Sequence, residues 1–215
     1  HNFMLIKGKE TLGVFFDVAG IISFDVGETD IDKLIVTSDD QDLDVYIIDG
    51  TSMQDIVTQF RAMIGRSYIP PKWAFGYHQS RWFYKTEDDF REIAKKYQEA
   101  KIPLDAIYMD IDYMDEYSSF TINRKNLPNF EGLVSEMKEQ GIHLVPIIDA
   151  GIKVKPGYNI YEEGVKGNHF CKDANGNDFK CGVWPGYCHL VDVLNDEHRK
   201  WFGDQYKFLL DKGID

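Results

Sequence analysis

Acidic side chains follow the apolar runs in the middle of the chain, and they are the residues whose types and spacing could do chemistry. Asp110 and Asp112 end the run that starts at Leu104, and Asp149 ends the run Leu144–Ile148. A carboxylate there costs free energy unless it has a charged or hydrogen-bonding partner. Such carboxylates could bind sugar hydroxyls, hold a metal ion or exchange protons. Solvated acids at strand ends are the alternative that the pattern leaves open.

Two tryptophans accompany these acids. Trp82 follows a strand and the polar segment 78–81, and Trp184 lies in a Pro/Gly turn over 183–186, where a core position is unfavourable. Core packing is the alternative for Trp82. Flat rings can cover the apolar face of a pyranose while carboxylates accept hydrogen bonds from its hydroxyls. Acids and aromatic rings together therefore favour a carbohydrate ligand.

Composition excludes several other classes of function. The 215 residues carry a net charge of −12, with 43% hydrophobic and 28% charged residues, which is typical of a globular protein. The negative field repels phosphate backbones and anionic lipids, so we expect no nucleic-acid or membrane partner. No apolar run reaches the length of a membrane span. The motifs typical of nucleotide-binding loops, zinc proteases and serine hydrolases are absent.

The three cysteines, Cys171, Cys181 and Cys188, give no disulfide framework. The turn signal at 175–176 predicts a hairpin that sets Cys171 opposite Lys180, so the two flanking thiols are offset. A zinc site is disfavoured because close cysteine pairs are missing. Free thiols favour a reducing compartment, and we therefore expect a cytoplasmic protein.

The elements that must position these residues fall into two groups. Over residues 1–66, short β-branched and aromatic runs alternate with turn residues, and a helix ending at Gly65 follows. This pattern predicts the end of a β-sandwich domain with a connecting helix. The strands are expected at Phe3–Ile6, Leu12–Phe16, Ile21–Val26, Leu34–Thr37 and Leu43–Ile48.

From residue 67 onward strands alternate with helices, which predicts an α/β fold with a parallel sheet, either a barrel or a doubly wound sheet. A long insertion at about 150–194 interrupts the repeat. In a barrel the active site lies at the carboxyl ends of the strands, where the acids are found. The strands are expected at Trp73–His78, Leu104–Asp110 and Ile142–Asp149, and the helices after Thr86, over Phe130–Gln140 and from Asn195 to Gly213.

Four segments carry a resemblance to a known family: 70–76 (PPKWAFG), 79–82 (QSRW), 108–114 (YMDIDYM) and 183–186 (VWPG). Together they resemble glycoside hydrolase family 31, which comprises α-glucosidases, isomaltases and α-xylosidases. The family has an N-terminal β-sandwich followed by a (β/α)₈ TIM barrel. The resemblance therefore implies that residues 67–215 are the first part of such a barrel.

The resemblance also implies which residues contact the substrate. Asp110 would bind hydroxyls of the terminal glucosyl unit, and the same subsite would be lined by Trp82, Ile111, Asp149, Ile152 and Trp184. The family retains the anomeric configuration, using one aspartate as nucleophile and a second acid as acid/base. Both are expected beyond residue 215. No residue here is assigned a catalytic role, and no metal or cofactor is expected.

The implied function is that of a retaining exo-α-glucosidase acting on short oligosaccharides linked α-1,4 or α-1,6, and a homo-oligomer is compatible with it. The alternatives are an α-xylosidase, a sugar-binding protein without turnover, and a metal-dependent barrel in which Asp110, Asp112 and Asp149 hold Mg²⁺ or Mn²⁺.

Three positions depart from the family pattern. Phe83 replaces the usual glycine and would narrow the mouth of the subsite. Ser119 replaces an aspartate, and Val191 replaces a proline. These departures bear on substrate preference.

Overall fold

The computed structural model describes residues 2–183 and 185–214, which form two compact units within residues 1–69 and 70–215. Within the described residues, no helix has the length and apolar character needed to cross a membrane.

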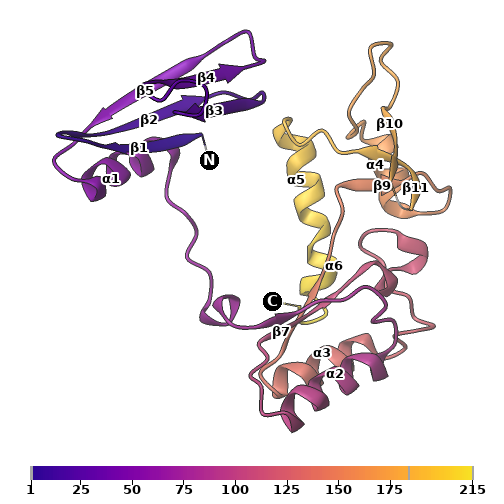
Figure 1. Cartoon of the computed structure of the whole chain (residues 1–215). Helices are drawn as coiled ribbons and strands as arrows, with labels where there is room; N and C mark the ends of the chain where they lie inside the picture. Colours follow the sequence, from indigo (N-terminus) through magenta and orange to yellow (C-terminus); the bar gives the residue numbers. More distant parts are fainter. Residues whose placement is uncertain (1, 184, 215) are drawn as a thin grey trace. The chain divides into compact units, whose positions relative to one another are not determined.

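The first unit contains five strands in two antiparallel sheets and one helix (Figure 1). Every strand end lies within one residue of the position that the sequence predicts, because turn residues separate the apolar runs so clearly. One sheet has the order β1-β2-β5 and the other is the hairpin β3-β4. The elements are β1 (Phe3–Lys7), β2 (Thr11–Asp17), β3 (Ile22–Val26), β4 (Leu34–Ser38), β5 (Asp44–Asp49) and α1 (Met53–Ile64).

Helix α1 packs against the sheet β1-β2-β5. The Ser52 side chain accepts a hydrogen bond from the Asp55 amide at 3.1 Å and caps the first turn. The apolar stripe of α1 brings Ile56 and Phe60 into a buried cluster with Ile48. Gly13 of β2 permits this packing, because a Cβ atom there would lie 2.6 Å from the side chain of Ile56.

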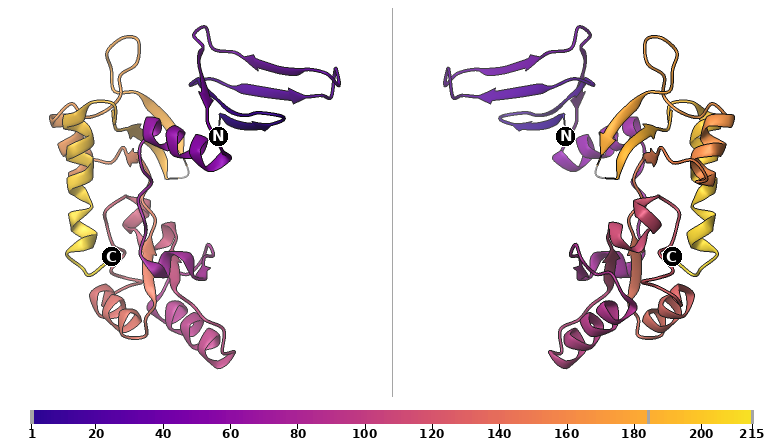
Figure 2. Two further views of the ribbon diagram at one scale, coloured as in Figure 1. Left: turned by 90° about the vertical axis from the view of Figure 1, so that its left-hand side faces the viewer. Right: turned by 90° about the vertical axis from the view of Figure 1, so that its right-hand side faces the viewer.

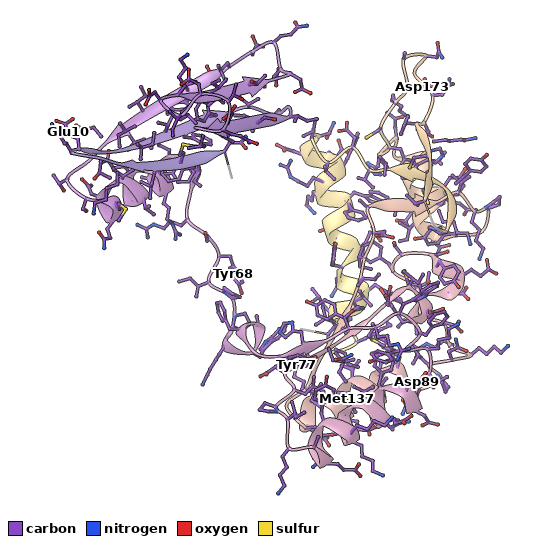
Figure 3. All side chains as sticks on the ribbon, in the orientation of Figure 1. Glu10, Tyr68, Tyr77, Asp89, Met137 and Asp173 are labelled. Atoms are coloured by element: carbon purple, nitrogen blue, oxygen red, sulfur yellow. The ribbon has the colours of Figure 1, made fainter. Side chains whose placement is uncertain are left out.

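The second unit begins with strand–helix–strand repeats that form a parallel sheet of order β6-β7-β8. Helices α2 and α3 pack against one another, joined by Arg91 Nε and Glu136 Oε2 at 2.8 Å. Met137 of α3, labelled in Figure 3, is fully buried in the core that these elements share. The elements are β6 (His78–Gln79), α2 (Glu87–Glu99), β7 (Ala106–Met109), α3 (Phe130–Glu139) and β8 (His143–Pro146).

These repeats confirm the predicted α/β class. The described residues contribute three neighbouring parallel strands and form no closed barrel.

The sequence prediction is wrong at the start of this unit. The strand expected over 73–78 is instead the short helix η1 (Lys72–Phe75) followed by the two-residue strand β6. The chain bends because Gly76 passes so close to Asp105 that a Cβ atom would lie 2.0 Å from its carboxylate. That carboxylate accepts a hydrogen bond from the Tyr77 amide at 3.0 Å, so pairing starts only at the next residue.

The expected final helix is also different. It divides into α5 (Asp196–Gln205) and α6 (Lys207–Leu210), separated at Tyr206. Leu209 is buried, whereas Leu210 is exposed. Consecutive helical residues point about 100° apart, so one leucine of the pair faces the core and the other does not.

The insertion folds into an antiparallel sheet of order β10-β11-β9 and one helix, as Figure 2 shows from two sides. The sequence did not predict β9 or α4, because each is short and the glycine-rich, polar pattern around them is typical of loops. The elements are β9 (Gly151–Lys153), α4 (Asn159–Lys166), β10 (Lys180–Val183) and β11 (Gly186–Leu190).

The predicted hairpin exists, but its turn spans residues 173–176, with Asp173 near the tip in Figure 3. Its pairing is wrong by one residue: Lys172 lies opposite Asp178, so Cys171 lies opposite Phe179. The reason is that Asp173 Oδ1 accepts hydrogen bonds from the amides of residues 175 and 177, which closes a five-residue loop. All three thiols are free.

Candidate functional site

The three parallel strands bring three of the predicted site residues, Trp82, Asp110 and Asp149, to one edge of the sheet. His78 pairs with Ala106, which pairs with His143, so the three strands start in register and run in the same direction. At their carboxyl ends Trp82 follows β6 by three residues, Asp110 follows β7 directly, and Asp149 follows β8 by three residues. The topology therefore gathers at this edge residues that are up to 67 positions apart in the sequence (149 minus 82).

The two carboxylate oxygens of Asp110 differ in their hydrogen bonding. Oδ1 accepts a hydrogen bond from the amide of Ile111 at 2.7 Å and so begins the short helix η2 (Ile111–Tyr113). The other oxygen accepts no hydrogen bond from the residues that the structure describes. The half-buried carboxylate is thus fixed by its own loop and keeps one acceptor for a ligand. The neighbouring Ile111 packs partly into the main core.

Asp112 is buried and faces a cation. Its Oδ1 lies 3.6 Å from Lys85 Nζ, while its Oδ2 is buried without a hydrogen-bond partner. Asp112 is therefore engaged by Lys85, whereas Asp110 is engaged by its own loop. Among residues 2–183 and 185–214, no group of three or more His, Cys, Asp or Glu side chains could hold a metal ion. The geometry therefore gives no support to the metal-dependent alternative built on Asp110, Asp112 and Asp149.

The loop that carries Asp149 is anchored through its backbone. The Tyr113 hydroxyl donates a hydrogen bond to the Ile147 carbonyl at 2.9 Å, and Ser119 Oγ donates to the Asp149 carbonyl at 3.3 Å. Burial, with a smaller contribution from the charge of Asp149, raises the pKa of Tyr113 above its ordinary value. The tyrosine therefore stays protonated and remains a donor. Asp149 Oδ2 is buried without a partner.

Asp149 also lies close to the sheet of the insertion. Burial raises the pKa of Cys188 to about 11, and the neighbouring Cys181 thiol and the Asp149 carboxylate add to the shift. Cys181 and Cys188 face one another across β10 and β11. The raised pKa keeps Cys188 a neutral thiol at physiological pH.

The loop after β6 exposes two aromatic rings. Trp82 and Phe83 are 52% and 54% exposed and stack with their ring centroids 4.3 Å apart. The next residue, Tyr84, is buried, and its hydroxyl accepts a hydrogen bond from Gln79 Nε2 at 2.9 Å. Tyr84 thus anchors the loop and leaves the two preceding rings at the surface.

Two further residues, Ile152 and Trp184, were predicted to contact the substrate. Ile152 is 0% exposed, in a core with Tyr158, Phe170 and Val191, so its side chain offers no surface to a ligand in this structure. Its position in β9, whose small sheet has its own core, accounts for this burial. Trp184 lies outside the described residues.

Sequence reasoning missed the residues that brace the site. Ser119, singled out only as a departure from the family pattern, links two loops: its hydroxyl binds the Asp149 carbonyl, and its own carbonyl accepts a hydrogen bond from the Tyr158 hydroxyl at 2.5 Å. Lys85 was overlooked because a lone lysine before a helix gives no signal of its buried partner. A cavity of about 340 Å³ lies beside this region, lined by Phe120, Lys155 and others, but by none of the six predicted contacts.

Comparison with known proteins shows the family. A sequence model described as the glycosyl hydrolases family 31 TIM-barrel domain matches residues 67–215. The chain belongs to glycoside hydrolase family 31. The resemblance seen in the four sequence segments is thereby confirmed.

Similar proteins agree with this assignment. The chain is 41% identical to alpha-glucosidase 2 of Bacillus thermoamyloliquefaciens over 213 residues, which is 99% of this chain but 27% of that protein. A family 31 α-glucosidase from Bacteroides thetaiotaomicron has a similar crystal structure, with a TM-score of 0.83 and 32% identity over 96% of this chain and 35% of that one.

A third match widens the range of activities in the family. A family 31 dextranase from Flavobacterium johnsoniae, solved in complex with isomaltotriose, gives a TM-score of 0.79 and 28% identity, over 94% of this chain and 25% of that one. This chain thus spans between about a quarter and a third of the length of each of these relatives.

Proposed function

We propose that the whole protein carrying this chain is a retaining exo-α-glucosidase that removes terminal glucose from short α-linked oligosaccharides. The observation that carries the proposal is Asp110, which keeps one carboxylate oxygen available at the strand edge that also carries Trp82 and Asp149. Membership of family 31 and the α-glucosidases among its relatives support the reaction class.

In this proposal the residues of the chain bind the sugar. The available oxygen of Asp110 accepts hydrogen bonds from glucosyl hydroxyls, and these bonds strengthen as charge develops at the anomeric carbon. The exposed ring of Trp82 covers the apolar face of a pyranose. Ile111, Asp149 and Trp184 are proposed to complete the subsite. Ile152 is proposed to support it from the buried side, in agreement with its burial.

The reaction itself requires two further acids. A nucleophilic carboxylate attacks the anomeric carbon while an acid protonates the leaving oxygen, and water then releases glucose with its configuration retained. We propose that both acids lie on later strands of the barrel. The residues described here would therefore govern binding and orientation and would not break the bond.

The direct test is to express the whole protein and follow hydrolysis of maltose, isomaltose, 4-nitrophenyl α-glucoside and 4-nitrophenyl α-xyloside. Release of α-glucose as the first anomer, observed by NMR, supports a retaining α-glucosidase. Preference for the xyloside would identify an α-xylosidase, and binding without turnover a sugar-binding protein. Activity abolished by EDTA and restored by Mg²⁺ or Mn²⁺ would favour the metal-dependent alternative.

Two further proposals concern the setting of the enzyme. The free thiols support a reducing, cytoplasmic location, which fractionation of the native host cells would test. Assembly into a homo-oligomer is proposed as well, and light scattering on the purified protein would measure it.

A further inference from the structure

The loop after β6 contains a residue whose backbone conformation is unfavourable for its type. Phe83 has φ of +85°, in the left-handed region that glycine enters freely and a phenylalanine enters at a cost. The neighbouring fold tolerates this strain at an exposed position, where a glycine or an asparagine would adopt the same backbone easily. The backbone conformation therefore does not account for a phenylalanine at this position, and its side chain is the part of the residue that could have a role.

Contacts from both sides hold that ring in place. The indole of Trp82 stacks on it with centroids 4.3 Å apart, and the ammonium of Lys85 lies over it at 4.7 Å from its centroid. Because a stacked indole and an ammonium cannot share one face, they cover opposite faces of the phenyl ring. Lys85 is itself fixed, since Nζ lies 3.6 Å from the buried Asp112 carboxylate and its amide donates to Asp89 Oδ2 at 2.9 Å.

Phe83 nevertheless remains 54% exposed, so part of the residue faces solvent despite these contacts. This arrangement is a rigid apolar ridge of two parallel rings at the carboxyl edge of the sheet. In the proposed site the terminal glucosyl unit reaches Asp110, which directly follows β7 and is half-buried. A second ring attached to that glucose would extend outward, past the exposed loop of residues 82 and 83.

We propose that Phe83 is a specificity-determining residue that contacts the leaving-group sugar of the substrate. The inference rests on the proposed function and names the part of the substrate that this loop recognises. The phenyl ring of Phe83 would favour a leaving group that is itself a pyranose ring over a small one. Phe83 takes no part in breaking the glycosidic bond.

The test compares substrates with and without a leaving-group ring in the whole protein. Phe83→Asn keeps a residue that tolerates the left-handed backbone and removes the ring, and Phe83→Tyr keeps the ring. Phe75→Asn is the matched control, because Phe75 is 74% exposed but precedes β6, at the opposite edge of the sheet. The substrates are maltose or isomaltose, which lose a glucose, and α-glucosyl fluoride, which loses a fluoride ion.

We expect Phe83→Asn to lower kcat/KM for the disaccharide about three- to tenfold, mainly through KM, with less than a twofold change for the fluoride. Phe83→Tyr and Phe75→Asn should each change both values less than twofold. Equal losses on both substrates, or no loss on either, would overturn the inference. If the unmodified protein cleaves none of these substrates, the proposed function fails instead, so the two failures are distinguishable.

Discussion

Replacing Asp110 by asparagine separates the two hydrogen-bonding roles of this residue. Oδ1 accepts a hydrogen bond from the Ile111 amide at 2.7 Å, and an asparagine oxygen can keep that bond. The second oxygen, which we propose binds a glucosyl hydroxyl, becomes an amide donor and the negative charge disappears. The substitution therefore removes the proposed ligand contact while it preserves the beginning of η2.

The expected effect follows from these contacts. A hydrogen bond to a charged group contributes about 1.5–3 kcal/mol. At about 1.4 kcal/mol for each factor of ten, kcat/KM should fall roughly 10- to 150-fold. The free energy of unfolding should change by less than about 0.5 kcal/mol, as for surface substitutions that break no cap. Asp110→Ala loses the cap as well and should be less stable by about 1 kcal/mol.

The assay is steady-state hydrolysis of 4-nitrophenyl α-glucoside by the whole protein, together with denaturant unfolding of each variant. Asp88→Asn is a suitable control, because Asp88 is an almost fully exposed acid in the first turn of α2. An unchanged kcat/KM in Asp110→Asn would refute the assigned role. A loss of activity that only parallels a loss of stability would refute it equally.

Three further predictions concern the framework around the site. The Arg124 guanidinium lowers the pKa of Glu131 to about 2, so the stability gained from this pair should be present above pH 4.5 and be lost as the pH falls toward 2. Because both side chains are nearly half exposed, the difference in Tm between the unmodified protein and Glu131→Gln should be small at pH 7, equivalent to about 1 kcal/mol or less, and vanish near pH 2. Tyr158→Phe leaves the buried Ser119 carbonyl without its donor and should cost about 1–3 kcal/mol in urea unfolding, whereas a cost near zero would contradict that bond. Ile152→Ala should cost about 2–5 kcal/mol, and a fall in kcat/KM without loss of stability would instead show direct contact with substrate.

Local sequence signals predicted most of the elements, and their failures have physical causes. The helix after Thr86 was predictable because the Thr86 hydroxyl and the Asp89 carboxylate form a reciprocal capping box. The strand expected at 73–78 failed because the contact of Gly76 with Asp105, 29 residues away, overrides the local β propensity. A pattern along the chain contains no information about such a contact.

The candidate site, like the fold, was predictable from the sequence only in part. The carboxylates and Trp82 at strand ends could be identified from the sequence, since an acid after an apolar strand is conspicuous wherever the strand lies in the fold. Their gathering on one edge depended on the parallel order β6-β7-β8, which the alternation of strands and helices predicted. The burial of Ile152 did not follow, because its neighbours Phe170 and Val191 belong to strand pairings within the insertion.

By itself the sequence determined the family, the class of fold and the residue types available for binding a sugar, because motifs and periodicity are properties of neighbouring residues. Only the tertiary structure decided which oxygen of Asp110 is available, that Lys85 faces Asp112, and that Phe83 is held in a left-handed backbone between two partners. These features are hydrogen bonds, contacts and backbone angles that are set only when the sheet and its loops pack together.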